Sequence, residues 1–128
     1  MKKTILTIGF FLMLFAFAEE SKAQNNTWIF VESYKGVNVY WRYRQELKDQ
    51  YISELKFENK NSYKVEIKVL PSFFCQDGTR KDYSEMMDTI AGYGTKAGQW
   101  EGYAWYPCDG TRPPSKGGFK SFSVKESQ

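Results

Sequence analysis

Apolar and polar residues alternate in two segments of the chain, from Val37 to Arg44 and from Tyr63 to Val69. A period of two places successive side chains on opposite faces of a β-strand, so both segments predict strands with one buried and one hydrated face. Between them, Leu55 and Phe57 alternate with charged residues in a third predicted strand, residues 52–58. The turn-forming residues at 59–62 predict that this strand forms a hairpin with the strand that begins at Tyr63.

The remaining strands are predicted from β-branched and aromatic residues bounded by glycine, proline or Asp-Gly turns. They cover Trp28–Val31, Tyr83–Ile90, Trp100–Tyr106 and Phe119–Val124. The segment Tyr83–Ile90 also fits a single helical turn. Seven short strands at intervals of about ten residues are typical of two packed antiparallel sheets. The pattern therefore predicts an all-β sandwich, and a small closed β-barrel fits nearly as well.

The first 23 residues follow a different pattern. A positively charged start precedes a nearly unbroken apolar run from Ile5 to Ala18, and the small residues Ser21 and Ala23 stand just before Gln24. These features are typical of a secretory signal peptide cleaved after Ala23. The leader resembles bacterial signals that are cut by the general signal peptidase.

Two alternatives to this leader stay open. A second cut is possible before Glu19, and an uncleaved membrane anchor would need about 20 apolar residues, more than this run contains. No later stretch of the sequence is long enough to span a bilayer. We expect residues 1–23 to be removed, and residues 24–128 to form one secreted or periplasmic domain with no stable membrane insertion.

The only two cysteines, Cys75 and Cys108, gain meaning from this predicted export. Paired thiols persist as disulfides in oxidising compartments, so we expect a Cys75–Cys108 bond. It would stabilise the fold by about 3–4 kcal/mol by restricting the unfolded chain. A zinc site is the alternative, but two thiols without any histidine lack the usual ligands. We expect no metal and no cofactor.

The two cysteines also begin two similar segments. Each is followed by Asp-Gly-Thr-Arg, once with an extra glutamine: Cys75-Gln76-Asp77-Gly78-Thr79-Arg80 and Cys108-Asp109-Gly110-Thr111-Arg112. A disulfide holds its two Cα atoms within about 7 Å, so both turns would emerge at one end of the domain. The converging charges are Asp77, Arg80, Asp109 and Arg112. Paired arginines hold a carboxylate or sulfate group well, although these residues also fit ordinary turns whose charges neutralise each other.

Aromatic residues are the second candidate for binding, because nine Tyr and four Trp lie after residue 23. Tyr40 lies on the strand face opposite Val39 and Trp41. Trp100 and Trp105 fall on opposite faces of one predicted strand, so at least one should be less buried. Exposed rings stack on sugars or anchor protein partners. The alternative is that large rings fill the short core.

Charge and residue types exclude several classes of function. Three basic and two acidic residues lie within residues 1–23, which leaves 15 basic and 13 acidic residues and a net charge of +2. Such a mixed surface lacks the basic patch of a nucleic-acid-binding protein. The chain has no histidine, the commonest general base. Glu54 and Glu66 face each other across the predicted hairpin, but neighbouring lysines make them part of a hydrated charge ladder.

From about Trp28 to Val124 the strand spacing resembles that of immunoglobulin-like and fibronectin-type-III-like domains. The cysteines depart from the antibody pattern, in which a buried Trp lies between two core cysteines. The resemblance therefore implies an architecture and assigns no residue a role. We expect an exported, non-catalytic module that binds another protein in the cell envelope or outside the cell. A carbohydrate-binding module is the alternative, and a small hydrolase is a third hypothesis.

Overall fold

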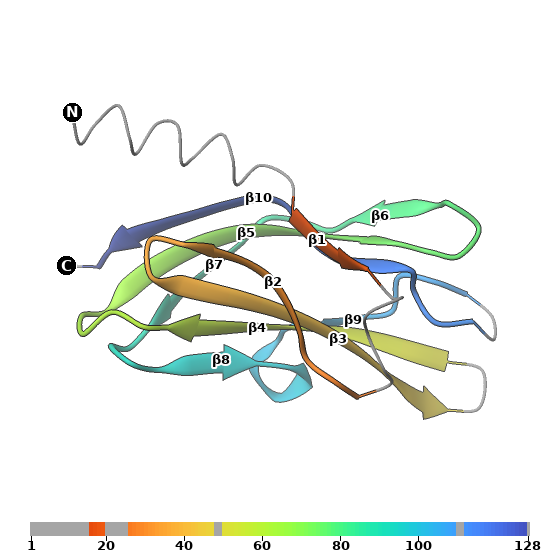
Figure 1. Cartoon of the computed structure of the whole chain (residues 1–128), viewed down its shortest axis with the longest axis horizontal. Coiled ribbons are helices and arrows are strands. Elements are labelled where there is room, and N and C mark those ends of the chain that lie inside the picture. Colours follow the sequence, from red (N-terminus) through yellow and green to blue (C-terminus); the bar gives the residue numbers. More distant parts are fainter. Residues whose placement is uncertain (1–15, 20–25, 48–49, 110–111, 128) are drawn as a thin grey trace.

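The computed structural model describes residues 16–19, 26–47, 50–109 and 112–127, which form two antiparallel β-sheets packed face to face (Figure 1). The strands are β1 (Ala16–Glu19), β2 (Ile29–Tyr34), β3 (Val37–Leu47), β4 (Gln50–Asn59), β5 (Val65–Phe74), β6 (Arg80–Asp82), β7 (Met86–Ile90), β8 (Thr95–Ala97), β9 (Ala104–Trp105) and β10 (Lys116–Glu126). A short 3-10 helix at Gln99–Glu101 lies between β8 and β9. The predicted all-β sandwich is confirmed.

Each sheet has five strands arranged around a long central pair. The first sheet has the order β1-β10-β5, and both β6 and β7 pair with β5. The second has the order β2-β3-β4, and both β8 and β9 pair with β4. Within the described residues no pairing joins the two sheets, so they form a sandwich and not a closed barrel. Strands outnumber the predicted seven partly because two short strands share one edge in each sheet.

The alternating residues of the central strands form the core, as the sequence predicts. The fully or almost fully buried ones on β3, β4 and β5 are Val37, Val39, Trp41, Leu55, Phe57, Val65, Ile67 and Val69. The ring of Phe57 lies 5.7 Å from that of Phe122 on β10, and this contact joins the two sheets. Burying one such aromatic or branched side chain contributes about 2–3 kcal/mol. The alternation therefore determines which face of each strand is inside.

The predicted hairpin between the third strand and the Tyr63 strand is wrong. β4 belongs to the second sheet and β5 to the first, so residues 60–64 cross from one sheet to the other. The buried side chain of Asn59 holds this crossover: its amide nitrogen donates to the carbonyl oxygens of Tyr63 (2.9 Å), Ile90 (3.2 Å) and Ala91 (3.0 Å). A local turn signal cannot distinguish a hairpin from a crossover, because the side-chain contacts that decide between them are distant in sequence.

β1 is a strand that lies within the predicted leader. It pairs antiparallel with β10, from Ala16 opposite Phe119 to Glu19 opposite Lys116. The expected cleavage site after Ala23 lies outside the described residues, so the leader stays a prediction. Across the segments that the structure describes, there is no helix with the length and apolar character needed to traverse a bilayer.

Candidate functional site

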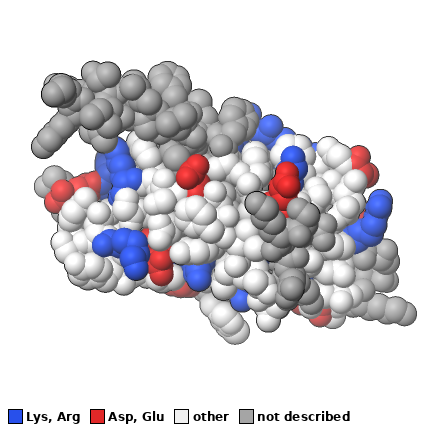
Figure 2. Space-filling model, viewed as in Figure 1, with Lys and Arg blue, Asp and Glu red and all other residues white. Residues whose placement is uncertain are grey.

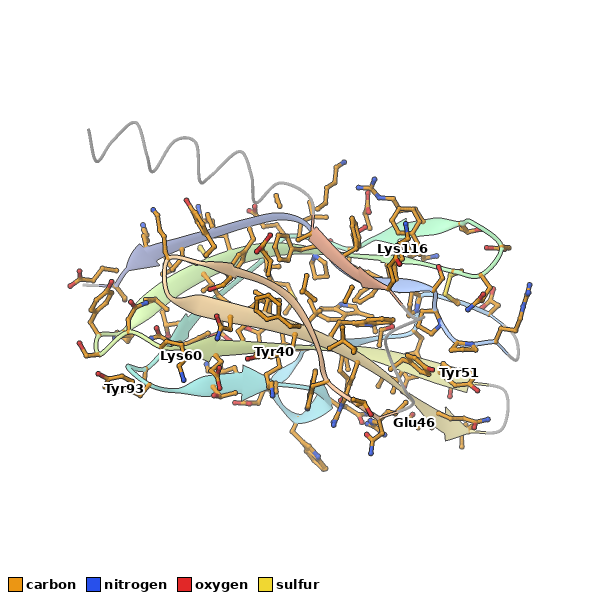
Figure 3. The ribbon with its side chains drawn as sticks, viewed as in Figure 1. Tyr40, Glu46, Tyr51, Lys60, Tyr93 and Lys116 are labelled. Carbon is orange, nitrogen blue, oxygen red and sulfur yellow. A yellow bond between two sulfur atoms is a disulfide. The ribbon has the colours of Figure 1, made fainter. Side chains whose placement is uncertain are left out.

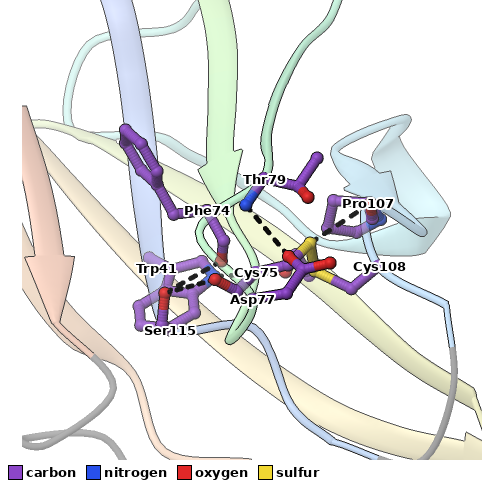
Figure 4. Close-up of a disulfide and its surroundings, with 9 residues drawn as sticks. Trp41, Phe74, Cys75, Asp77, Thr79, Pro107, Cys108 and Ser115 are labelled. Carbon is purple, nitrogen blue, oxygen red and sulfur yellow. Dashed lines mark hydrogen bonds between the residues drawn. A yellow bond between two sulfur atoms is a disulfide. The ribbon is translucent and has the colours of Figure 1, made fainter.

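A disulfide joins Cys75 to Cys108, as predicted, with the two Cα atoms 5.7 Å apart (Figure 4). It ties the turn between β5 and β6 to the segment that follows β9. Such bonds are typical of proteins in oxidising compartments. We name this end of the domain, built from residues 75–81 and 107–112, the disulfide rim; its Gly110 and Thr111 lie outside the described residues.

The first turn of the disulfide rim is closed by its own backbone. The N–H of Gly78 donates to the carbonyl of Cys75 (2.9 Å), and Gly78 has a φ of 89°, which favours glycine. The carboxylate of Asp77 accepts a hydrogen bond from the N–H of Thr79 (2.9 Å) (Figure 4). This bond, with a smaller effect from Arg112, holds the pKa of Asp77 below its ordinary value. Asp77 is therefore an ionised turn residue at neutral pH.

Three of the four predicted charges line one open cleft beside the disulfide. The cleft has a volume of about 200 Å³, and its charged lining is Asp77, Lys81, Asp109 and Arg112. Arg80 is not part of this lining. Its Nε donates to Asp82 (2.8 Å), and its guanidinium lies 5.8 Å from the ring centre of Phe74. The cleft therefore has two acidic and two basic residues, and the predicted pair of arginine forks does not form there.

Tyr40 lies on the outer face of the second sheet, and its ring is already occupied (Figure 3). The Nζ of Lys56 lies 4.5 Å from its ring centre, and the ring of Phe30 packs edge-on at 5.8 Å. The hydroxyl donates to Glu58 (3.3 Å). Burial and the charge of Glu58 raise the pKa of Tyr40. Lys56 and Phe30 thus limit the ring area that a ligand can reach.

The two predicted site tryptophans differ sharply. Trp105 on β9 is half-buried and packs against Phe73 (5.5 Å), Tyr83 (5.9 Å) and Tyr103 (6.5 Å between ring centres). It fills the core, which is the alternative that the sequence left open. Trp100 is 98% exposed. The prediction that one strand carries both residues is wrong, because Trp100 lies in the 3-10 helix that precedes β9.

Residues 98–102, which we name the Trp100 turn, have a defined backbone. Gly98 and Gly102 have φ values of 70° and 87°, in the region that glycine tolerates. The N–H of Gly98 donates to Leu55 O (3.1 Å), and the N–H of Tyr103 donates to Gly98 O (2.9 Å). The first bond fastens the turn to β4 and the second closes the turn on itself, so the exposed indole stands on a defined backbone.

A buried carboxylate beneath the Trp100 turn completes this support. Glu54 is 2% exposed and accepts hydrogen bonds from Arg42 Nε (2.8 Å), Arg44 Nε (3.1 Å) and the N–H of Gln99 (2.9 Å). Burial alone would raise the pKa of Glu54, but these donors outweigh burial and hold the pKa below its ordinary value. A Cβ on Gly98 would lie 2.8 Å from Glu54 Oε2, so the turn comes too close to the carboxylate for a larger residue.

Glu54 does not lie in the hydrated charge ladder with Glu66 that the sequence predicts. Glu66 lies on β5 in the other sheet, where it pairs with Lys125 (3.1 Å). The available signal was Arg42 and Arg44 on the polar face of the neighbouring strand; Arg42 stands directly opposite Glu54 in the β3–β4 pairing. The alternation of residues along β3 and β4 gives no sign of the Trp100 turn, which covers Glu54.

Elsewhere among the described residues, Asp88 accepts hydrogen bonds from the hydroxyl of Tyr103 (2.6 Å) and from Lys96 (2.9 Å), which engage both of its carboxylate oxygens. Acidic and basic residues are interspersed on the face shown in Figure 2. Among the residues that the structure describes, no three potential ligands lie close enough to hold a metal ion. The sequence matches no family model, no curated protein and no solved structure.

Proposed function

We propose that this chain is an exported, immunoglobulin-like β-sandwich that binds another protein in the cell envelope or outside the cell, with Trp100 as the anchor. The observation that carries the proposal is a 98% exposed indole on a turn that is fixed by hydrogen bonds to the buried carboxylate of Glu54 and to the backbone of β4. Trp is strongly enriched among the few residues that dominate protein interfaces. Exposure of a large apolar ring to water is unfavourable in free energy, and burial against a partner removes this unfavourable contribution.

The support under Trp100 favours affinity as well as exposure. Binding loses free energy when a mobile loop must be ordered. Here Glu54, Gln99 and the backbone of β4 order the turn before any partner arrives. The backbone that carries the indole is therefore already ordered before binding, and only the side chain of Trp100 has to be fixed by the partner.

Carbohydrate binding is the second candidate, because the bare ring of Trp100 could also stack on a sugar. The other outward rings favour it less. Tyr40 lies against Lys56, and Arg42 lies 4.3 Å from the ring centre of Trp28. A sugar would stack on Trp100 without help from these two rings, whereas a protein partner can rely on one central anchor.

We propose no catalytic role for the carboxylates. Glu54 is engaged by two arginines and a backbone N–H, and its depressed pKa keeps it ionised. Asp77 has a depressed pKa too, so it holds no proton to donate near neutral pH. A general acid needs the opposite shift.

The test compares affinity capture by three forms of the exported protein: wild type, Trp100→Ala and Tyr93→Ala. Tyr93 is the control because it is another exposed ring, 74% accessible, and it lies in the turn between β7 and β8, outside the Trp100 turn. We expect Trp100→Ala to lower recovery of a specific partner protein at least about 10-fold, as for an interface hot spot. Tyr93→Ala should leave recovery unchanged.

Equal recovery by wild type and Trp100→Ala would contradict the proposal. The same proteins should also be titrated with soluble polysaccharides while tryptophan fluorescence is followed. Quenching that disappears in Trp100→Ala, without capture of a protein, would favour carbohydrate binding instead.

A further inference from the structure

One edge of the first sheet is covered by residues that the sequence assigns to the leader. β1 pairs with residues 116–119 of β10, on the side of β10 that faces away from β5. It lies beside β2 at the open side of the sandwich (Figure 1). A cut after Ala23, as the sequence predicts, removes this strand from the exported protein. The backbone N–H and C=O groups of β10 along that edge then lose their partners.

The edge is shaped for a strand to lie against it. Gly118 has no side chain where β1 passes: the three atoms nearest to a Cβ placed there all belong to Ala16 and Phe17, and the Cβ would overlap the carbonyl oxygen of Ala16. The neighbouring Gly117 has its own reason, because a Cβ there would overlap the indole of Trp41. Gly118 therefore serves the approach of a strand and not the packing of the core.

The seated segment shows which chemistry fits. Ala16 and Ala18 point inward and are 8% and 6% exposed, so the inner positions accept small apolar side chains. Phe17 points outward, with its ring edge-on to Phe74 at 5.2 Å. Glu19 stands opposite Lys116 (Figure 3). A register shift in the β10–β5 pairing between Phe119 and Ser121 lies directly beyond the paired residues.

We propose that the exported protein binds an extended segment of its partner protein as an added strand along Lys116–Phe119. The segment has small residues at alternate positions, an aromatic residue between them and an acidic residue after them. Main-chain hydrogen bonds supply affinity in such strand addition, and the alternate side chains supply specificity. An unpaired edge is a template for another strand unless it is blocked. The inference rests on the proposed function, since export with cleavage is what vacates the edge.

The test uses the full-length chain expressed with export, so that the host itself processes the leader. Mass spectrometry of the exported protein should give an N-terminus at Gln24. The probe is an acetylated peptide with the sequence of residues 16–22, Ala-Phe-Ala-Glu-Glu-Ser-Lys. At saturating peptide, we expect hydrogen exchange to slow at least about 10-fold at those amides of residues 116–119 whose N–H points towards the vacated edge, and to stay unchanged at the alternate amides that point towards β5. The same peptide with proline at its third position should not protect them, because proline lacks the N–H.

Gly118→Ala is the matched variant, and Lys125→Ala, at the other end of β10, is its control. Gly118→Ala should weaken peptide binding at least about 10-fold without changing the unfolding midpoint, while Lys125→Ala should bind as wild type. An exported protein that retains residues 16–19, or equal protection by both peptides, overturns the inference. Capture of the partner that depends on Trp100 but not on Gly118 also overturns it and leaves the proposed function standing. Capture that depends on neither contradicts the proposed function itself.

Discussion

The Trp100 turn and the disulfide rim are the two candidate binding surfaces that the sandwich presents among its described residues, and they are held in place by opposite kinds of contact. The rim is held by a covalent bond, and it presents exposed charges of both signs. The turn has no covalent tie, and it presents one large apolar ring above a buried ionic cluster. The rim exposes charged side chains and is held by a disulfide. The turn exposes an aromatic ring and is held by hydrogen bonds to a buried carboxylate.

The difference is the reason why we propose the turn and not the rim as the binding surface. Opposite charges in water attract each other by no more than about 1 kcal/mol, and water already solvates them. The carboxylates and cations of the rim therefore gain little from a partner. The indole of Trp100 is largely apolar, so its burial against a partner is favourable in free energy. The rim ties two segments of the fold together by its disulfide, and we propose the Trp100 turn, not the rim, as the binding surface.

Removing the disulfide should have the largest effect on the free energy of unfolding. The double variant Cys75→Ala, Cys108→Ala should lower the free energy of unfolding by about 3–4 kcal/mol, because the cross-link closes a segment with a sequence separation of 33. Urea unfolding measures it. Capture of the partner should be unchanged at temperatures where the variant stays folded. Loss of capture in the folded variant would show that the rim takes part in binding.

Removing the buried carboxylate should have the next largest effect. Glu54→Ala removes the acceptor of Arg42 Nε, Arg44 Nε and the N–H of Gln99, and we expect a loss of about 3 kcal/mol in unfolding free energy. Glu66→Ala is the control, since its partner Lys125 is largely exposed, and the expected loss is below about 1 kcal/mol. Glu54→Ala should also speed hydrogen exchange in the Trp100 turn and leave the turn at residues 75–79 unchanged. Similar losses for the two variants would mean that Glu54 is not an anchor.

Acidification should give the smallest and most selective effect. The folded pKa of Glu54 is depressed, so its stabilising contribution is present above the unfolded pKa of about 4.3 and is lost as the pH falls through the folded value. The unfolding free energy should therefore decrease below about pH 4.3. In Glu54→Gln the decrease should be shallower, with only the remaining depressed carboxyls, such as Asp82 and Asp88, contributing. Parallel pH profiles for the two proteins would assign the acid sensitivity elsewhere.

The sequence by itself determined the properties that depend on neighbours along the chain and on the count of residue types. The alternation of Val37, Val39 and Trp41 placed the inner face of β3, since successive side chains of a strand must point to opposite sides. Two cysteines in a chain without histidine, behind a leader that predicts export, were enough to predict their bond.

Only the tertiary structure decided which strands became neighbours and what covered their polar faces. Where the sequence predicts a hairpin, Asn59 holds a crossover between the sheets through hydrogen bonds to residues up to 32 positions away. The Trp100 turn covers Glu54 through Gln99, which is 45 positions away in sequence. Trp105, beyond this turn, packs against the core. A repeating pattern records the face on which a side chain lies. Burial depends on what packs over that face, and that is set by contacts between segments distant in sequence.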